Sequence, residues 1–542
     1  MGIRNIYTMI QMVTSVSARF LHIERSVLML TWYFNLKTMK RNLNIYLFTA
    51  LIMIGFSSCE KFLDVNDDPN NPVNENLPLS AKLPAALLST VNQEAIQLNQ
   101  LGAFWGGYWG TNSEGINQYF KEKSYDGPSI RHQRDGIPIW ENGFQNLLYY
   151  QLIKEQSLAE SAGYYTGISK IMQGWHFLRL VDIYNNIPFD DALQGTRFPT
   201  PRYEAGQVVY QKSINLITEG INEIKSAAAD PGIARADIIF NGSKPLWAKF
   251  GNTIKLRALV RQSEKNNQAY IAAEIQKIQA EGSGYLELNQ NVTLKPGYEN
   301  TAGKLNPFWE TYYRNVQGAT TAAYDNLRPT TFLIDQYKQR NDPRMAKIYQ
   351  AVAGDYKGVL FGNPNASAEY NRAVTSALRG PQENGNAAAG LLKSAIQPLL
   401  LMGAFESLFL QAEAAQRGWI AGNAKTLYEQ GIQSSFAYNE VPATGFVVYN
   451  IQATVNFDLA ADKISAIITQ KWLAMNGTNG IEAWSDYRRL GLPLIPNSLQ
   501  APSATARPLR LMYPESERQT NNAEATRQGG DQVTVDKVWW DN

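Results

Sequence analysis

Two short segments combine aromatic side chains with polar groups that can bind a ligand. The first is FWGGYWGTN, residues 104–112, and the second is FWETYYRN, residues 308–315. Flat aromatic faces stack on the apolar C–H faces of sugar rings, and a neighbouring amide or guanidinium can then bind the hydroxyl groups. The two segments supply eight candidate ligand-binding residues: Trp105, Tyr108, Trp109, Asn112, Trp309, Tyr312, Tyr313 and Arg314.

Burial is the alternative interpretation of these rings, because tryptophan and tyrosine pack in a core more often than they face a ligand. Trp247, Trp472 and Trp484 lie on regular helical stretches, and we assign them to the core. We expect Trp539 and Trp540 to hold the C-terminus against the body of the protein.

Candidate catalytic groups are few. Asp190 and Asp191 in NIPFDDALQG are adjacent on a loop and point in different directions, whereas glycoside hydrolysis needs two facing carboxylates about 5 to 10 Å apart. Only His132 and His176 are available beyond residue 58 for a Ser-His-Asp triad, and His176 beside Trp175 is typical of a packed helix histidine. No GxSxG, HExxH or phosphate-loop motif is present. The sequence therefore predicts a binding protein that is not an enzyme and uses no cofactor or metal.

The single cysteine, Cys59, follows a segment with the three parts of a secretory signal peptide. Residues 39–58 have a basic head, an apolar body of 14 residues and small residues directly before the cysteine. This arrangement resembles the lipobox of bacterial lipoproteins, in which the cysteine is lipidated and becomes the mature N-terminus. We predict a lipid anchor at Cys59, a tether over residues 59–79 and, over residues 1–38, an upstream extension that is either spurious, from the choice of start site, or dispensable. The alternative is a buried free thiol.

The tract DVNDDPNNPVNE, after the cysteine, has the oxygen spacing of a calcium-binding EF-hand loop from Asp64 to Glu75. The sixth position of such a loop needs a positive φ angle, but Pro69 occupies it and its ring fixes φ near about −65°. We therefore interpret the tract as a polar tether.

The charge of the chain depends on this N-terminal segment. The 542 residues carry a formal net charge of +2, but residues 1–58 hold six basic side chains and one acidic side chain, a net of +5. The mature chain would therefore carry −3, and nothing in it favours a nucleic-acid partner.

Hydrophobic spacing predicts a mainly helical fold. The clearest helical pair is FESLFLQAEAAQRGW, ending near Gly418, followed by NAKTLYEQGIQSSFAY, starting near Asn423. In its second helix, Ala424, Tyr428 and Gly431 match the small, aromatic, small spacing of a tetratricopeptide repeat. GWHFLRLVDIY followed by YEAGQVVYQKSINLITEGINEI predicts a second pair of this kind.

The predicted fold class is therefore all-α, with a tetratricopeptide-like helix-pair core and little strand. We expect one domain over residues 80–542, with loop-rich insertions around residues 286–330 and 354–390, where Gly, Asn, Pro and Tyr are frequent. Such insertions on a helical core are typical positions for a ligand-binding face.

Seven segments, in this order along the mature chain, resemble the SusD/RagB family and within it SusD-like group 2: CEKFLDVNDDPNNP, LWAKFGNTIKLRALVR, NDPR, QAEAAQRGW, LYEQGIQSSF, QKWLAMNG and EAWSDYRRLGLP. The tail RPLRLMYPESE fits the same family. The order and spacing of these segments make the match specific.

This resemblance implies a surface-exposed, lipid-anchored protein of the outer membrane that passes nutrient to a SusC-type TonB-dependent transporter. Oligosaccharides are the usual cargo of the family in polysaccharide utilisation, and peptides are the cargo of RagB-like members. Two alternatives therefore stay open beside glycan binding: a peptide-binding protein, and a structural lid or adhesin with negligible ligand affinity of its own.

Overall fold

The computed structural model describes residues 77–501 and 506–542. The predicted upstream extension, signal peptide, Cys59 anchor and most of the tether, including the Asp64 to Glu75 tract, lie outside the described residues. Within the part of the chain that is described, no helix is both long enough and apolar enough to cross a membrane.

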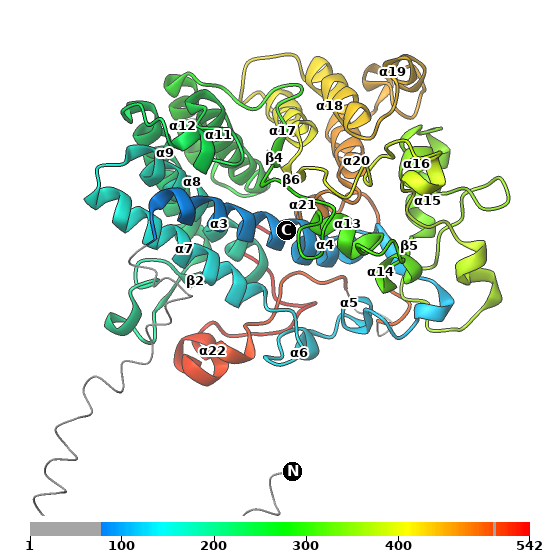
Figure 1. Ribbon diagram of the computed structural model, residues 1–542, viewed down its shortest axis with the longest axis horizontal. Helices are drawn as coiled ribbons and strands as arrows, with labels where there is room; N and C mark the ends of the chain where they lie inside the picture. The colour runs from blue at the N-terminus through cyan, green and yellow to red at the C-terminus, as the bar shows by residue number, and fades with distance from the viewer. Residues whose placement is uncertain (1–76, 502–505) are drawn as a thin grey trace, which may run out of the picture. The chain divides into compact units, whose positions relative to one another are not determined.

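Helices make up most of the described chain, which confirms the predicted fold class (Figure 1). The helices of eight residues or more are α3 (Leu79–Asn92), α7 (Ile139–Ala159), α8 (Gly163–Tyr184), α9 (Gly206–Ser226), α11 (Lys244–Arg261), α12 (Gln268–Glu281), α15 (Thr331–Gln339), α17 (Ala404–Gln416), α18 (Ala424–Tyr438), α19 (Ala443–Asn450), α20 (Lys463–Met475) and α21 (Gly480–Leu490). The shorter helices are α4 (Asn99–Trp105), α5 (Phe120–Ser124), α6 (Gly127–Ile130), α10 (Ile233–Ala236), α13 (Pro307–Tyr312), α14 (Ala322–Asn326), α16 (Arg344–Ile348), α22 (Glu515–Thr520) and α23 (Asn522–Arg527). A π-helical segment, η3 (Gln93–Leu98), joins α3 to α4.

Strands are short and pair only two by two in the described chain. They are β1 (Trp109–Thr111) with β5 (Leu327–Pro329), β2 (Ile187–Pro188) with β3 (Tyr203–Glu204), and β4 (Val292–Leu294) with β6 (Leu399–Met402), all antiparallel. In the first pair Trp109 lies opposite Pro329. Each pair joins segments that are distant in the sequence or flank a loop, and none forms a larger sheet.

The predicted helix pair around residue 420 is confirmed. Helix α17 ends at Gln416, Gly418 takes a positive φ of 75°, and the side chain of Asn423 caps α18 by accepting from the Thr426 amide at 3.0 Å. Gly431 is required because a β-carbon there would lie 2.8 Å from the Phe409 ring of α17. The small residue thus allows the close approach that a tetratricopeptide-like pair needs.

The second predicted pair is also present as α8 and α9, and α8 packs on α7 as well. Helix α11 contacts both α9 and α17, and therefore links the two groups of helices. Helix α3 packs along α7, as Figure 1 shows in blue and cyan. This arrangement places η3 next to the N-terminal half of α7.

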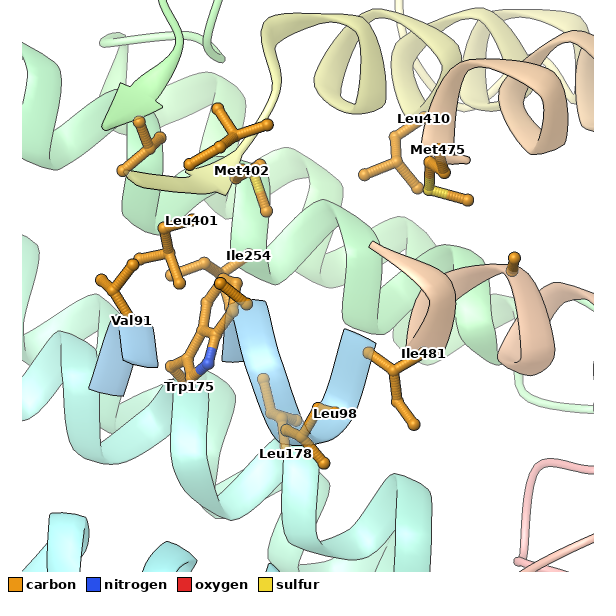
Figure 2. Close-up of a cluster of buried hydrophobic side chains, with 14 of the residues drawn as sticks. Val91, Leu98, Trp175, Leu178, Ile254, Leu401, Met402, Leu410, Met475 and Ile481 are labelled. Carbon is orange, nitrogen blue, oxygen red and sulfur yellow. The ribbon is translucent and has the colours of Figure 1, made fainter. Parts of the chain in front are cut away.

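Trp247, Trp472 and Trp484 are fully buried, which confirms their assignment to the core. Figure 2 shows part of that core, with Trp175 of α8 among Val91 of α3 and other apolar side chains. Burial of such rings removes large apolar areas from water and dominates the stability of a helical core.

A group of buried charges, which we call the buried ion cluster, crosses this core. Arg179 of α8 binds Glu94 of η3 at 3.0 Å and Glu482 of α21 at 2.6 Å, and Arg261 of α11 binds Glu482 at 2.6 Å. Burial alone would raise the pKa of Glu482, but the guanidinium groups of Arg257, Arg261 and Arg179 hold it well below its ordinary value. The cluster therefore ties η3, α8, α11 and α21 together as charged partners.

The C-terminus is held against the body by both terminal tryptophans, as expected. The Trp540 indole donates to Asp182 Oδ1 at 2.9 Å, and the Trp539 amide donates to Asn185 Oδ1 at 2.8 Å.

The two loop-rich regions differ in content. Residues 286–330 contain β4, α13, α14 and β5 between irregular segments, whereas residues 354–390 contain only the short 3₁₀ turns η6 (Ala368–Tyr370), η7 (Arg372–Val374) and η8 (Pro381–Asn384).

Candidate functional site

The first predicted aromatic segment is buried. Trp105 donates from its indole to the Glu122 carbonyl at 2.9 Å, and Tyr108 stacks on Trp472 with ring centroids 4.9 Å apart. Asn112 uses its amide to donate to the Asp325 carbonyl at 2.7 Å. The chain turns back after α4, so that β1 pairs with β5 and carries these side chains inward. The side chains of this segment therefore present no exposed stacking face in this structure, and their role in ligand binding stays a prediction.

The second segment is buried in part. Tyr312 meets Trp109 edge to face at 5.1 Å, and the Tyr313 hydroxyl donates to Glu383 Oε2 at 2.8 Å. Trp309 and Arg314 keep part of their surface in contact with solvent. Six of the eight candidates are thus buried, and the six are Trp105, Tyr108, Trp109, Asn112, Tyr312 and Tyr313. The physical reason is that each of these rings finds an apolar or aromatic neighbour from a distant segment, which local spacing cannot reveal.

A cleft of about 450 Å³ lies between η3 and α7, beside the first residue of α13. We call it the amide-lined cleft because its lining contains no charged side chain and is dominated by amides. Its lining residues are Ser89, Asn92, Gln93, Ile96, Gln97, Asn142, Gln145, Asn146, Tyr149 and Pro307.

Two pairs of amides connect the walls of this cleft. The Asn142 amide donates to Gln97 Oε1 at 2.8 Å, and the Asn146 amide donates to Gln93 Oε1 at 2.7 Å. Both pairs join η3 to α7, and the members on each element are four residues apart. A π-helical turn is wider than an α-helical one and is frequent at functional sites. The two hydrogen-bonded amide pairs therefore hold η3 and α7 at a fixed spacing along one side of the cleft.

Polar atoms in this cleft are left without partners. The Oδ1 atoms of Asn92 and Asn146 are buried and accept no hydrogen bond from any described residue. Asn146 is only 1% exposed, so its free acceptor lies in a nearly water-excluded position. An unpaired buried acceptor costs about 1 to 3 kcal/mol, and a small rearrangement that brings a hydroxyl donor to it would remove that cost.

One aromatic ring is available at the edge of the cleft. Tyr149 is 40% exposed, and the half-buried Ile96 adds an apolar surface. A ring, an apolar patch and several amides together form the chemistry that binds a neutral polyhydroxylated ligand.

The buried side of η3 holds the cleft in place. Glu94 points away from the amides and accepts from the Trp175 indole at 2.7 Å as well as from Arg179. Under α7, Tyr150 and His176 both meet the Thr90 hydroxyl, at 2.8 and 2.9 Å. Burial lowers the pKa of His176 to about 3, so the ring is neutral. The interpretation of His176 as a packed helix histidine is therefore confirmed.

The two adjacent carboxylates are occupied by separate cations. Asp190 binds Lys212 at 2.6 Å, and Asp191 binds Arg202 at 2.6 Å. The Arg202 guanidinium, bonded to the carboxylate, holds the pKa of Asp191 below its ordinary value. These carboxylates face different partners, as the sequence predicts for neighbours on a loop. Among the described residues, no group of three His, Cys, Asp or Glu side chains is arranged to hold a metal ion.

The residues of the amide-lined cleft are not among the eight predicted candidates. A signal is present in the sequence, since Gln93 and Gln97, and likewise Asn142 and Asn146, are spaced to lie on one face of a helix. Only the packing of α3 and η3 on α7 shows that these two faces meet.

The helix-pair core and the loop-rich insertions define a helical protein of the tetratricopeptide-like class. A family model described as "Starch-binding associating with outer membrane" matches residues 76–514. The match covers most of the chain, and the protein therefore belongs to the SusD-like family.

Solved structures show the same fold. A SusD homologue from Bacteroides fragilis is 23% identical, with 84% of this chain and 98% of that chain covered and a TM-score of 0.68. A chitin-binding SusD homologue from Flavobacterium johnsoniae is 22% identical, with 85% and 98% covered and a TM-score of 0.68. A SusD homologue from Bacteroides thetaiotaomicron is 20% identical, with 86% and 99% covered and a TM-score of 0.68. No curated protein sequence matches the chain.

Proposed function

We propose that this protein binds an oligosaccharide at the cell surface and delivers it to a SusC-type TonB-dependent transporter, while a lipid on Cys59 anchors it to the outer membrane. The family description, starch-binding and associated with the outer membrane, supports the ligand class and the location. The similarity to a structure named as a chitin-binding protein supports a glycan as well. In this proposal the protein binds its ligand and does not catalyse a reaction.

The observation that carries the proposal is the charge-free, amide-lined cleft with its unpaired acceptor oxygens. Sugar hydroxyls are both donors and acceptors, so they can pair with amide oxygens and nitrogens without bringing a charge into the site. A ligand that accepts from Gln97 or Gln145, and donates to Asn92 after a small rearrangement of that side chain, would use residues that line the cleft. Tyr149 would supply the stacking face that the sequence analysis expects from other rings.

Trp309 and Arg314 remain candidate ligand residues in this proposal. Trp309 is two residues after Pro307, which lines the cleft, and both belong to α13. The six buried candidates would meet a ligand only if the surrounding loops moved.

A structural lid with negligible affinity of its own is the second candidate function. Burial of six of the eight predicted ligand residues favours it, because an aromatic platform was the main expectation for ligand binding. A peptide-binding protein is the third possibility, and it would use the same amides through the peptide backbone.

Calorimetric titration of the intact chain tests the proposal. The ligands are neutral malto-, chito- and xylo-oligosaccharides, with uncharged peptides as a separate panel. We expect a neutral oligosaccharide to bind, and Gln97→Ala to weaken it about three- to tenfold, the effect of one lost hydrogen bond.

Gln211→Ala is the matched control, because Gln211 is a half-buried amide on α9 that lies outside the amide-lined cleft. Binding that is equally sensitive to both substitutions would contradict the assignment of the cleft. Binding of peptides alone would indicate the peptide-binding alternative, and the absence of binding by either panel would support the lid.

A further inference from the structure

A second cleft, of about 490 Å³, lies between the C-terminal half of α7, α8, α9 and the loop after α8. It shares helix α7 with the amide-lined cleft but none of that cleft's lining residues. We call it the cationic cleft after Lys154 and Arg197, which line it together with two carboxylates, Glu155 and Asp190. Asp190 is already paired with Lys212 at 2.6 Å.

The floor of the cationic cleft is apolar. Phe177 and Phe189 pack with ring centroids 4.4 Å apart, and Phe189 is only half-buried. Leu193 and Leu216 continue this surface. Phe177 is buried, so the accessible part of the floor is the half-buried Phe189 with Leu193 and Leu216.

The two cations of this cleft lack carboxylate partners within the described chain. Lys154 Nζ donates to Gln173 Oε1 at 3.0 Å, and Arg197 Nη1 donates to Gln194 Oε1 at 3.1 Å. Neither forms an ion pair with any described residue. Nearby Lys170, by contrast, lies 3.2 Å from Glu219 and 3.3 Å from another glutamate.

A chain of amides links Lys154 to Glu155, a carboxylate that also lines the cleft and forms no ion pair with a described residue. Gln173 accepts from Lys154 and donates to Gln151 Oε1 at 3.0 Å, and Gln151 in turn donates to Glu155 Oε1 at 2.6 Å. The cation and the anion therefore stand at opposite ends of a hydrogen-bonded chain. Burial, followed by the Lys170 cation, lowers the pKa of Lys154, although the carboxylates of Glu155 and Glu219 oppose this shift.

We propose that the cationic cleft binds a carboxylate-bearing ligand with an apolar face. The carboxylate would meet Lys154 and Arg197, and the apolar face would lie on Phe189 and Leu193. A carboxylate would supply the missing anionic partner of the half-buried Lys154 and of the exposed Arg197 through charge-assisted hydrogen bonds. This site is separate from the proposed neutral-sugar site and does not depend on it.

Two kinds of molecule carry this chemistry, and the experiment separates them. One is the C-terminal carboxylate of a peptide with an apolar last residue, and the other is a uronic acid residue of an acidic oligosaccharide. The probes for calorimetric titration of the intact chain are N-acetyl-dipeptides ending in Phe or Leu, their C-terminal amides, oligogalacturonates, and neutral galacto-oligosaccharides.

We expect at least one carboxylate probe to bind about tenfold or more tightly than its neutral counterpart, the effect of a hydrogen bond to a charged group. Lys154→Gln removes the charge and keeps a hydrogen-bond donor, and we expect it to abolish that difference. Lys170→Gln is the matched control, because this lysine is on the adjacent helix and already has two carboxylate partners.

Preference for the acidic peptides identifies a peptide terminus as the ligand, and preference for the oligogalacturonates identifies a uronic acid; either result supports the site. Equal affinity for charged and neutral probes, no binding by any carboxylate probe, or an equal loss in Lys154→Gln and Lys170→Gln would overturn it. A neutral oligosaccharide is titrated against the same variants. Its affinity tests the amide-lined cleft alone, so a failure of the proposed carboxylate site can be distinguished from a failure of the proposed neutral-sugar site.

Discussion

Helix α7 contributes to two clefts, and the chemistry differs between them. Its N-terminal half meets η3, where amides pair with amides and no charge lines the cleft. Its C-terminal half meets α8 and the following loop, where an apolar floor lies beside two cations without carboxylate partners. The comparison teaches that one helix can support two independent ligand preferences, because the neighbouring element determines which of its faces is covered and which is open.

The two clefts share a support in the buried ion cluster. Arg179 of α8 joins Glu94 of η3 to Glu482 of α21, so the wall of the amide-lined cleft is tied to the helix that also borders the cationic cleft. The charged groups of this cluster pair with each other, whereas Lys154 and Arg197 of the cationic cleft bond only to amides. Ion pairing in the cluster holds the scaffold, and the proposed ligand sites use groups that lack a charged partner.

Breaking this shared support has the largest expected effect. Arg179→Met would leave Glu94 and Glu482 without a cation that both contact, and we expect the free energy of unfolding to fall by about 3 to 5 kcal/mol. Unfolding by denaturant measures this change in the free energy of unfolding. Arg235→Met is the control, because Arg235 is exposed and its loss should change stability by about 0.5 kcal/mol or less. Equal stability of the two variants would contradict a structural role for the cluster.

Forcing α8 away from α9 has the next largest expected effect on stability, and it should disturb the cationic cleft more than the amide-lined cleft. In Gly220→Ala the new β-carbon would lie 2.7 Å from the Gly167 carbonyl oxygen. We expect the free energy of unfolding to fall by about 1 to 3 kcal/mol. We also expect carboxylate binding in the cationic cleft to weaken more than neutral-sugar binding. Asn215→Ala, an exposed position on the same helix, is the control. Equal weakening of both ligands would show that the clefts are coupled.

Removing the exposed ring has a smaller effect, confined to the other cleft. Tyr149→Ala should weaken a neutral oligosaccharide by about 1 kcal/mol, roughly fivefold, through the lost stacking face, while Tyr149→Phe keeps most of it. Calorimetry gives both values. Leu158→Ala, at an exposed position on α7 outside both clefts, should bind as the unmodified chain does. A carboxylate probe should bind all three variants equally, and any loss of its affinity in Tyr149→Ala would argue against separate clefts.

The smallest expected effect is a difference between the two clefts in how ligand affinity depends on pH. Burial lowers the pKa of Lys154 below its ordinary value of 10.5. A carboxylate binds the protonated lysine, so its affinity should fall as the pH rises through this lowered pKa, whereas neutral-sugar binding should stay constant. The other charged groups near Lys154 are Glu155 on α7, Lys170 on α8, Glu219 on α9, and Arg197 and Asp190 in the loop. Calorimetric titrations between pH 7 and 10 measure the affinity for the carboxylate ligand. If that affinity falls equally with pH in Lys154→Gln, one of these neighbours and not Lys154 causes the pH dependence.

The fold could be predicted from the sequence to a large extent because its determinants are local. The pair around residue 420 follows from apolar periodicity, from the cap at Asn423 and from the small residue Gly431. The core positions of Trp247, Trp472 and Trp484 follow from the same periodicity.

The candidate site could not be predicted in the same way. Tyr108 and Trp109 have the composition of a stacking platform, but Trp472 and Tyr312 cover them from segments hundreds of residues away. Local sequence shows which side chains have a suitable chemistry, and it does not show which neighbours cover them.

The sequence by itself determined the helix-pair class, the family and the small number of groups suited to catalysis, because periodicity, capping and motif order are properties of neighbouring residues. The tertiary structure alone decided which polar and aromatic groups remain open. Asn146 meets Gln93 across 53 residues of chain, and Lys154 meets Gln173 rather than a carboxylate, because the packing of α7 against its two neighbours sets these distances. The proposed ligand sites therefore depend on tertiary packing, which decides which side chains are left without a charged partner.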